Sequence, residues 1–406
     1  MEAGRTRWLP IGLLVAVGIA AAMQFAKVST IFVEVTEAFG APEPIAALFI
    51  SAPAIVGMLL GLTASVAAAR IGFRRVILAC LAIGGLLSLA ESFLPPVPVF
   101  LALRLLEGVA HLGLVVSCPV LIILLSTRRH VSLAMSLWGA FFGLAFAITG
   151  WAAPAVEARW GVAGVFLGHA LVFAVLLIAV VLLLPRVAGD GPQAQVRGDG
   201  FFRAHALAYR SPRAFLPGVV FVFHTMMYVP LVAFVPLFAD PAIAGVLLVW
   251  MPLVSIVGTI VAGFVGQYTV TPPVVLIAGY AGVAVLVLGV WAAVAAEGAL
   301  LVAPLALMFF SGLVQGAAFG LIPALSTDPV VTSRANGVLT QLGNLGSTIG
   351  PPVFASLIAG VGVTAFAPMA WLVVALCAAG GAVSVIALRM TGARPRSGLA
   401  VPHDAP

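Results

Sequence analysis

Three ionisable side chains fall within two helical turns of one another in the stretch RLLEGVAHLG, residues 104–113. Arg104, Glu107 and His111 stand at positions i, i+3 and i+7, which lie on one face of a helix. The flanking sequence is apolar, and a charge at the centre of a bilayer costs about 2.5–3.5 kcal/mol on insertion scales. The pattern therefore predicts a buried polar site that pairs its charges, binds a charged solute or exchanges protons.

A second polar face is predicted in the first apolar stretch, where Gln24, Lys27 and Glu34 stand at i, i+3 and i+10. Lys27 is the only lysine in the chain. We expect Lys27 and Arg104 to coordinate an anionic group of a solute, while Glu107 or Glu34 exchanges a proton and competes for these cations. A carboxylate that loses its cationic partner in a low dielectric takes up a proton more readily, so solute binding and protonation become linked.

Structural alternatives stay open for these residues. Arg104 and Glu107 could form an i, i+3 pair that only holds their helix in place, and Glu34 could be a solvated carboxylate at the mouth of the site. The two cations and two carboxylates sum to zero formal charge. That leaves His111 and His224 as groups able to titrate near physiological pH.

The elements that must position these residues are membrane-spanning helices. Hydrophobic residues make up 63% of the chain and its mean hydropathy is +1.23, far outside the soluble range. Apolar runs of about 20 residues or more recur throughout, whereas a transmembrane barrel would need shorter, alternating segments. The first run is too long for a signal-peptide core, so we expect a retained first helix. Twelve spans are expected, at residues 9–37, 45–69, 75–94, 98–126, 132–155, 162–185, 214–237, 243–267, 273–295, 299–325, 335–358 and 365–388.

Arginine placement orients these spans. The opposite loops carry Arg159 with Glu43, Glu157, Asp240 and Glu297, and by the positive-inside rule both termini are then cytoplasmic. The net charge of +6 is thus a topology signal and not a nucleic-acid footprint. The arginines expected on the cytoplasmic side are Arg5, Arg7, Arg70, Arg74, Arg75, Arg128, Arg129, Arg186, Arg197, Arg203, Arg210, Arg213, Arg334, Arg389, Arg394 and Arg396.

The three cysteines, Cys80, Cys118 and Cys377, lie singly in apolar spans without the spacing of a metal site or a disulfide framework. We expect them to be packing residues, and we expect neither a metal nor a cofactor. The strong preference for arginine over lysine is typical of a high-GC prokaryotic genome. We therefore expect a multi-pass protein of a bacterial inner (plasma) membrane.

One long hydrophilic segment, residues 186–213, divides the spans six and six. It predicts a cytoplasmic linker between an N-terminal six-helix bundle, residues 1–185, and a C-terminal bundle, residues 214–390, followed by a tail at residues 391–406. Within the linker, FFRAHALAY could form a short amphipathic segment at the membrane surface.

The two halves share a local pattern. GVAHLGLVVSCP in the fourth span and GLVQGAAFGLIP in the tenth both read Gly, two residues, a polar side chain, seven residues and Pro. His111 thereby corresponds to Gln315 and Pro119 to Pro323. A six-span offset is typical of parallel repeats, whose interface commonly binds the solute in transporters.

The chain resembles the major facilitator superfamily over essentially its whole length. Twelve spans, a six-plus-six division and a central cytoplasmic linker are typical of that family. The loop SVAAARIGFRR is similar to its Gly-x-x-x-Asp-Arg-x-Gly-Arg-Arg motif, with Ser65 at the glycine position and Ala69 at the aspartate position. The family's acidic residue helps to lock the outward-facing arrangement, so these departures alter the gating electrostatics. The gating residues that match the motif are Arg70, Gly72, Arg74 and Arg75.

RLLEG also resembles the family's Arg-x-x-Gln-Gly signature, with Glu107 in the glutamine position and Gly108 as its glycine. The antiporter signature of the fifth span is not evident in LWGAFFGLAFAITGWAAP, and the stretch from Pro119 through LWGAFFGLA has a weak likeness to cyanate-permease-like members. The resemblance implies an all-α fold of two pseudo-symmetric six-helix bundles. It also implies a cavity lined by spans one, four, seven and ten, to which His224 and Gln315 would contribute.

Three further polar side chains have a structural and a functional interpretation. Gln341 and Asn344, in LTQLGNLGSTIGPP, could bind solute or bond a neighbouring helix. His169, on the sixth span, lies outside the expected cavity set. We expect it to be a structural histidine bonded to a backbone carbonyl.

Enzyme motifs are lacking: the sequence has no Gly-x-Ser-x-Gly, no His-Glu-x-x-His and no Walker loop. We therefore expect a secondary transporter that acts as a monomer in the lipid bilayer. It would move a small organic anion or zwitterion, coupled to protons. The alternative is a drug-proton antiporter for lipophilic compounds. An unpaired Lys27 would repel lipophilic cations, whereas a neutralised Lys27 leaves the choice open.

Overall fold

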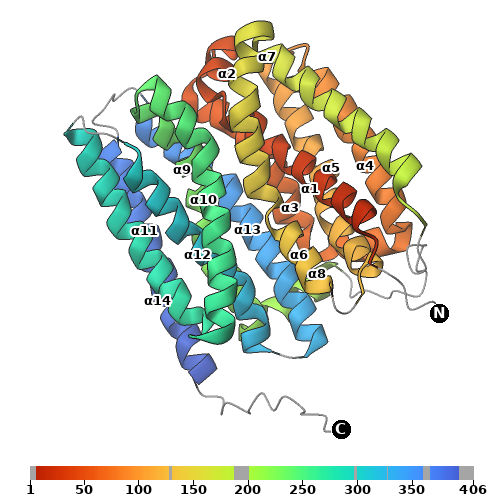
Figure 1. Ribbon diagram of the computed structural model, residues 1–406, viewed down its shortest axis with the longest axis vertical. Coiled ribbons are helices and arrows are strands. Elements are labelled where there is room, and N and C mark those ends of the chain that lie inside the picture. The colour runs from red at the N-terminus through yellow and green to blue at the C-terminus, as the bar shows by residue number, and fades with distance from the viewer. Residues whose placement is uncertain are drawn as a thin grey trace.

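The computed structural model describes residues 6–127, 130–186, 201–296, 300–326, 328–359 and 366–392, and every regular element within these ranges is a helix (Figure 1). Arg5, Arg128, Arg129, Arg197, Glu297, Arg394 and Arg396 lie outside the described residues, as do residues 187–200 of the expected linker and 393–406 of the expected tail. The elements are α1 (Trp8–Ser29), α2 (Phe32–Phe39), α3 (Glu43–Ile71), α4 (Phe73–Glu91), α5 (Val97–Leu125), α6 (Val131–Gly139), α7 (Phe141–Leu183), α8 (Phe201–Tyr209), α9 (Pro212–Phe234), the 3-10 helix η1 (Val235–Phe238), α10 (Pro241–Tyr268), α11 (Pro272–Ala295), α12 (Val302–Leu325), α13 (Pro329–Ile358) and α14 (Phe366–Gly392).

Ten of these helices are long and apolar enough to cross a membrane. One of them, α7, supplies two crossings, because Gly161 has φ 66° and ψ −179° and separates an arm ending at Trp160 from an arm beginning at Val162. The thirty-residue α13, which is not among the ten, packs along α3 and α9 and supplies the remaining crossing. The expected all-α membrane fold with twelve crossings is therefore confirmed.

Two of the expected spans are not single helices. The first was predicted as residues 9–37, but α1 ends at Ser29 and α2 begins at Phe32. Thr30 lies at the break between the two helices, and its hydroxyl donates a hydrogen bond to the Ala26 carbonyl at 2.9 Å. The fifth span is broken at Ala140, between α6 and α7.

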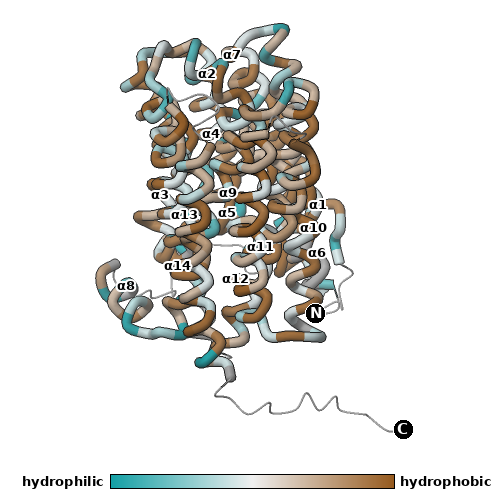
Figure 2. Tube along the Cα trace, turned by 90° about the vertical axis from the view of Figure 1, so that its left-hand side faces the viewer, coloured by the Kyte–Doolittle hydropathy of each residue, from teal (hydrophilic) through white to brown (hydrophobic). Residues whose placement is uncertain are grey.

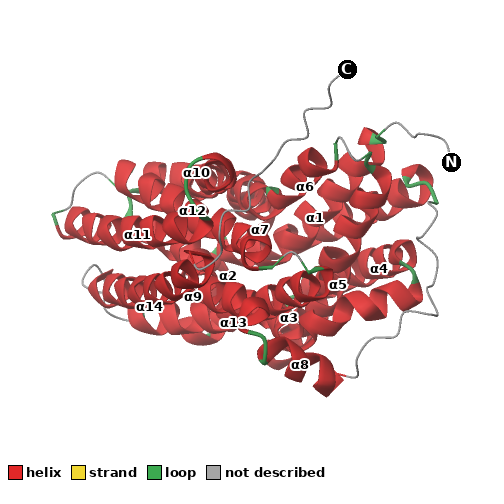
Figure 3. Ribbon diagram, turned by 90° about the horizontal axis from the view of Figure 1, so that it is seen from below, coloured by secondary structure: helices red, strands yellow, loops and turns green. Residues whose placement is uncertain are grey.

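The helices form two groups that lie side by side, α1 to α7 and α9 to α14 (Figures 1 and 3). The start of α1 and the end of α14 are on the same side, toward the bottom of Figure 1, which we call the terminal face. α2 and the bend of α7 lie at the opposite side, the far face. Hydrophobic residues dominate the middle of the molecule, and α8 lies at the margin of the terminal face (Figure 2).

The two groups touch toward both faces. On the terminal side of the middle, α3 packs on α13, with Gly337 against the Leu62 side chain. Toward the far face, the rings of Phe32 and Phe234 meet at 5.1 Å between centroids. The two halves thus contact each other toward both faces.

The turn between α3 and α4 depends on Gly72, whose φ of 99° is rarely adopted by residues with a side chain. Arg74 follows it and donates from Nε to the Leu184 carbonyl at 3.4 Å and from Nη2 to the Val181 carbonyl at 3.3 Å. These carbonyls are at the C-terminal end of α7, where the helix dipole is negative, so the positive guanidinium of Arg74 is stabilised there. Arg70 and Arg75 are exposed beside it.

The expected repeat is visible in the packing of two glycines. Gly108 of α5 lies against the backbone of Pro53 in α3, and Gly312 of α12 lies against the backbone of Ser255 in α10. These helix pairs are spans two and four in the first half and spans eight and ten in the second. The two halves therefore use the same close contact at corresponding positions.

Candidate functional site

Four charged side chains meet inside the first helix group and form what we call the charge cluster: Lys27 of α1, Glu91 of α4, and Arg104 and Glu107 of α5. Lys27 Nζ lies 2.6 Å from Glu91 Oε2 and 2.8 Å from Glu107 Oε1. Arg104 Nη1 pairs with Glu107 Oε2 and lies 3.7 Å from Glu91 Oε1. All four side chains are at most 1% exposed.

Backbone and neutral groups complete the coordination of the two cations. Arg104 donates from Nε to the Phe49 carbonyl at 2.7 Å and from Nη2 to the Gln24 carbonyl. Lys27 also donates to Ser88 Oγ at 2.9 Å, and its Nζ lies 4.8 Å from the centroid of the Phe166 ring. These contacts tie α1 to α3, α4, α5 and the second arm of α7.

His169 supports the cluster from behind. Its Nε2 donates to the Ala20 carbonyl at 3.0 Å, and its Nδ1 lies 3.2 Å from Ser88 Oγ. The same Ser88 hydroxyl accepts the hydrogen bond from Lys27. The expectation that His169 is bonded to a backbone carbonyl is confirmed.

The net charge of the cluster decides how it behaves in a membrane. With two cations and two carboxylates it sums to zero, and the hydrogen bonds above compensate the several kcal/mol that desolvating each ion costs. Neutrality depends on all four members, because removing or protonating one leaves an uncompensated charge in a low dielectric. The arrangement is therefore suited to sensing protons or ions.

Two carboxylates differ from the sequence expectation. Glu91 was not singled out, although it falls inside the expected third span, where any intramembrane carboxylate is a functional candidate. Glu34 lies outside the cluster, half-buried on α2. The i+10 spacing from Gln24 would have aligned Glu34 with Lys27 only in a continuous helix, and α1 ends between them. Glu91 takes the position expected for Glu34 beside Lys27.

The remaining predicted site residues fall into separate places. His111 donates from Nδ1 to the Ala21 carbonyl of α1 at 3.0 Å, on the same side of α5 as the cluster. In the second helix group, His224 of α9 lies 3.4 Å from Ser311 Oγ of α12 and hydrogen-bonds the Gln315 side chain. His224 and Gln315 are thus brought together, as expected, but away from Lys27 and Arg104.

An aromatic bridge, defined as Phe25, Phe142 and Tyr228, joins the two polar places. Phe25 meets His111 edge-on at 5.0 Å and Phe142 at 6.0 Å. Phe142 then meets Tyr228 of the second group at 6.0 Å, and Tyr228 meets His224 at 5.5 Å. The bridge crosses the boundary between the halves and closes it with aromatic rings.

Gln341 and Asn344 lie at the contact between α3 and α13. Gln341 donates from Nε2 to the Met58 carbonyl at 2.8 Å, and Asn344 packs against Gly57. The helix α8 adds to this contact: Tyr209 donates its hydroxyl to Gln341 Oε1 at 3.1 Å, and His205 Nε2 lies 3.1 Å from Gln341 Nε2. Gln341 therefore links both halves and the linker helix on the terminal side of the molecule.

Comparison with known proteins assigns this architecture. The model of the Major Facilitator Superfamily matches residues 13–351 of the chain. The chain belongs to the Major Facilitator Superfamily. No curated protein sequence matches it. It is accordingly a multi-pass membrane transporter and not an enzyme, as the sequence predicted.

Solved structures of superfamily transporters share this fold at low sequence identity. A bacterial homologue of the human lysosomal transporter Spinster, inward-facing and occupied, superposes with a TM-score of 0.74 at 12% identity, covering 95% of this chain and 97% of that one. Its unoccupied form gives 0.73 at 13% identity, covering 95% and 98%. A mutant of the nucleoside transporter NupG gives 0.68 at 13% identity, covering 94% and 99%.

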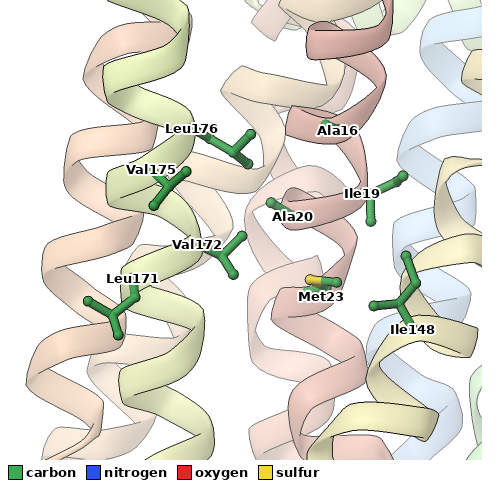
Figure 4. Close-up of a pocket in the computed structure, with 9 residues that line it drawn as sticks. All are labelled: Ala16, Ile19, Ala20, Met23, Ile148, Leu171, Val172, Val175 and Leu176. Carbon is green, nitrogen blue, oxygen red and sulfur yellow. The ribbon is translucent and has the colours of Figure 1, made fainter.

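An apolar groove of about 420 Å³ lies on the outside of this superfamily member, between α1 and the two arms of α7 (Figure 4). Ala16, Ile19 and Met23 line one wall and Leu171 and Val175 the other. Its lining is almost wholly carbon, so it offers a solute no polar partner. The groove is thus not the solute site.

The α8 contact predicts how readily this superfamily member opens on its terminal side. Partial burial raises the pKa of the Tyr209 hydroxyl, so the group stays protonated and donates to Gln341 at neutral pH. Replacing Tyr209 with Phe removes one hydrogen bond, worth about 0.5–1.5 kcal/mol. We expect a cysteine introduced at Leu62 to react with a maleimide about 2- to 10-fold faster in the Tyr209→Phe background, because the labelling rate follows the population of the open contact.

A matched control for that experiment is Tyr268→Phe, which removes the hydroxyl of an exposed tyrosine on α10. It should leave the labelling rate at position 62 unchanged. Equal rates in the wild type and in Tyr209→Phe would show that α8 does not hold this contact closed.

Proposed function

We propose that this transporter moves a small organic anion or zwitterion by proton-coupled symport and alternating access. The observation that carries the proposal is the position of Glu107, whose two carboxylate oxygens bind Lys27 and Arg104. A carboxylate shared by two cations competes directly with any solute anion for them. Proton uptake in the cluster reduces this competition and gives the cluster a net positive charge.

The physical consequence is a coupling between two ligands. A solute carboxylate that enters beside Lys27 and Arg104 restores neutrality to a protonated cluster, so proton and anion each favour binding of the other. Entry of the anion without the proton would leave an excess negative charge in a low dielectric, which is costly. The transporter therefore changes conformation most readily with both the proton and the anion bound or with neither bound, as symport requires.

The polar groups near the boundary between halves would complete the solute site. His111 reaches the boundary through Phe25, and His224 with Gln315 through Tyr228. Parting of the aromatic bridge would expose these groups to one solute from both bundles. A site divided between two repeats is the usual arrangement in transporters of this plan.

Opening and closing would move the two bundles against each other at contacts that the structure contains. The bundles at residues 1–185 and 214–390 would rock about α3–α13 and α7–α10, carrying the linker at residues 186–213 with them. Gln341 and Asn344 would close the terminal side together with the loop residues Arg70, Gly72, Arg74 and Arg75. Hydrogen bonding of Gln341 to Met58 and to α8 supports a gating role for it in preference to solute contact.

Arginines gather at the helix ends on one side of the molecule. The terminal face would be cytoplasmic, because Arg74, Arg75, Arg210 and Arg213 lie at helix ends on that side whereas Arg159 is on the far one. The protein would act as a monomer in a bacterial inner membrane. The tail at residues 391–406 would lie in the cytoplasm.

A second candidate function is exchange of protons for lipophilic compounds. The observation that favours it is the aromatic bridge, since ring faces attract organic cations and apolar solutes. Lys27 is no obstacle to this function, because Glu91 and Glu107 neutralise it. A protonated cluster would then repel the cation that a neutral cluster admits.

A thermal-stability screen distinguishes the two functions. Detergent-solubilised protein is heated with small carboxylates, inorganic anions, amino acids or lipophilic cations at two pH values. A ligand at 100 times its dissociation constant stabilises the folded state by about 2.7 kcal/mol. We expect an anion or zwitterion to raise the unfolding temperature, more strongly at the lower pH, and Lys27→Gln to abolish the shift.

The matched control is Arg159→Gln, which removes an exposed cation of the far face and should keep the shift. Stabilisation by lipophilic cations alone, undiminished in Lys27→Gln, would overturn the anion site and favour the exchange of protons for lipophilic compounds.

A further inference from the structure

The two carboxylates of the charge cluster are held very differently. Glu107 uses both oxygens, one for Lys27 and one for Arg104. Glu91 uses only Oε2, which receives Lys27 at 2.6 Å. Its Oε1 is buried without a hydrogen-bond partner, and the nearest cation, Arg104, is 3.7 Å away. Glu91 therefore has a free position for a proton, and Glu107 has none.

The groups that face Glu91 come from three other elements. Lys27 approaches from α1, and Arg104 and Glu107 from α5. His169 of α7 reaches the cluster through Ser88, which is on the helix of Glu91 itself. Because His169 Nε2 is bonded to the Ala20 carbonyl, its ring already has fixed partners on both nitrogens.

Glu91 also lies nearer to the far face than Glu107 along their helices. It is the last residue of α4, and Phe93, two positions later, is 78% exposed. The next residue, Leu94, has a φ of 47°, a left-handed conformation that is unfavourable for leucine and turns the chain sharply after Glu91. Glu107 lies ten residues inside α5 from Val97, which is about 15 Å of helix, although its carboxylate reaches the same Lys27 as that of Glu91. Glu91 is therefore the carboxylate of the cluster that is attached at the far-face end of a helix, and its free Oε1 distinguishes it from Glu107.

We propose that Glu91 is the residue that takes up the coupling proton, and that Glu107 is a positioning residue that stays ionised between the two cations. This assignment rests on the proposed function and adds its proton site. The proton from solution bonds to Oε1, the carboxylate becomes a neutral carboxylic acid, and no other bond is broken.

The charge balance then explains the order of events. The cluster changes from zero to one net positive charge, and Glu107 alone must neutralise Lys27 and Arg104. Lys27 loses its shorter charged contact, the 2.6 Å pair with Glu91, and is the cation freed for a solute anion. Loss of the proton restores that pair and expels the anion.

Infrared difference spectroscopy tests the assignment without a known solute. A protonated carboxyl group has a carbonyl band distinct from that of a carboxylate, so lowering the pH from about 8 to about 5 reveals buried acids as they form. We expect the purified wild type to gain a band that Glu91→Gln lacks. Glu107→Gln should gain the band at a lower pH than the wild type, because Glu91 is then the only carboxylate of the cluster that faces Lys27 and Arg104. Glu91→Asp should retain the band at a shifted position. It serves as the folded reference if Glu91→Gln is poorly stable. Glu157→Gln, at the far face, is the control.

Each other outcome has a defined meaning. A band lost in Glu107→Gln and kept in Glu91→Gln overturns the assignment to Glu91 but leaves proton coupling through the cluster intact. A band lost only in Glu34→Gln moves the proton site to α2 and overturns the inference. A band unaffected by all three substitutions, or absent from the wild type, overturns both the assignment and the proton-coupling part of the proposed function.

Discussion

An Arg104→Gln variant should unfold at a much lower temperature than the wild type, with a loss of about 3–5 kcal/mol in the free energy of unfolding. Arg104 is fully buried, and its guanidinium serves Glu107, Glu91 and the carbonyls of Phe49 and Gln24. Glutamine is too short to reach all of these acceptors. The variant leaves two carboxylates to share Lys27, a net negative charge in a low dielectric, and it strips two backbone carbonyls of their donor.

Charge restoration separates electrostatics from packing in this variant. Adding Glu107→Gln to Arg104→Gln returns the cluster to zero net charge, so the double variant should be more stable than the sum of the two single losses predicts. Lowering the pH should also narrow the gap between Arg104→Gln and the wild type, because one proton neutralises the excess carboxylate. Unfolding of detergent-solubilised protein, followed by loss of the monodisperse peak on heating, measures all of these effects.

Arg104→Lys is the matched control for charge alone. It keeps the positive charge but has neither the planar fork nor the reach of arginine, so its stability should fall between those of wild type and Arg104→Gln. If the double variant were no more stable than additivity predicts, the cluster would be a set of independent hydrogen bonds and not an ionic unit.

Helical spacing predicted part of this cluster and missed the rest for a definite reason. Arg104 and Glu107 are on one helix, where the i, i+3 relation fixes their proximity whatever the tertiary structure. Lys27 is on another helix, and its partnership followed only from the cost of leaving it alone in a membrane. Glu91 comes from a third helix, and no periodicity relates it to the others.

Glu34 was predicted to lie beside Lys27, and it does not. The prediction assumed that the first span is one continuous helix, but α1 ends at Ser29 and α2 begins at Phe32, so the two residues do not share a helix face. Thr30 and Ser29 both bond back to carbonyls of α1, at Ala26 and Phe25, a pattern common where helices bend or end. Hydropathy alone carries no signal at the break itself, because Ile31, Phe32 and Val33 continue the apolar run directly after it.

The fold itself was predictable because it depends on segment length and charge asymmetry. Twelve apolar runs and a six-plus-six division need no knowledge of side-chain contacts. The places of Gln341 and His224 do need that knowledge, since an amide or imidazole on a membrane helix serves equally well in a site or in a helix contact. The structure resolves these two residues differently: Gln341 is in the contact between halves, and His224 is beside Gln315.

A Gly312→Ala variant should be destabilised by about 1–3 kcal/mol, although alanine is the better helix former. The added methyl carbon would lie 2.8 Å from the Ser255 carbonyl carbon and 3.0 Å from the Thr259 nitrogen, both of them backbone atoms that cannot rotate away. α10 and α12 would have to separate, which also weakens the 3.2 Å hydrogen bond from Thr259 Oγ1 to the Gly312 carbonyl. Valine at the same position should be worse still.

The corresponding position in the first half, Gly108, should respond to alanine with a similar loss, because a methyl group there would lie 3.0 Å from the Pro53 carbonyl carbon. Gly289→Ala on α11 is the control: no atom lies within 4 Å of the added carbon, so helix propensity alone should keep or slightly raise the unfolding temperature.

Heating the three purified variants in the same detergent compares their unfolding temperatures. Equal unfolding temperatures for Gly312→Ala and Gly289→Ala would mean that the α10–α12 contact yields without cost, and that the repeated glycine has no packing role. A loss at both Gly108 and Gly312 would instead make close approach at this point a requirement of each six-helix half, which is why the sequence repeats it.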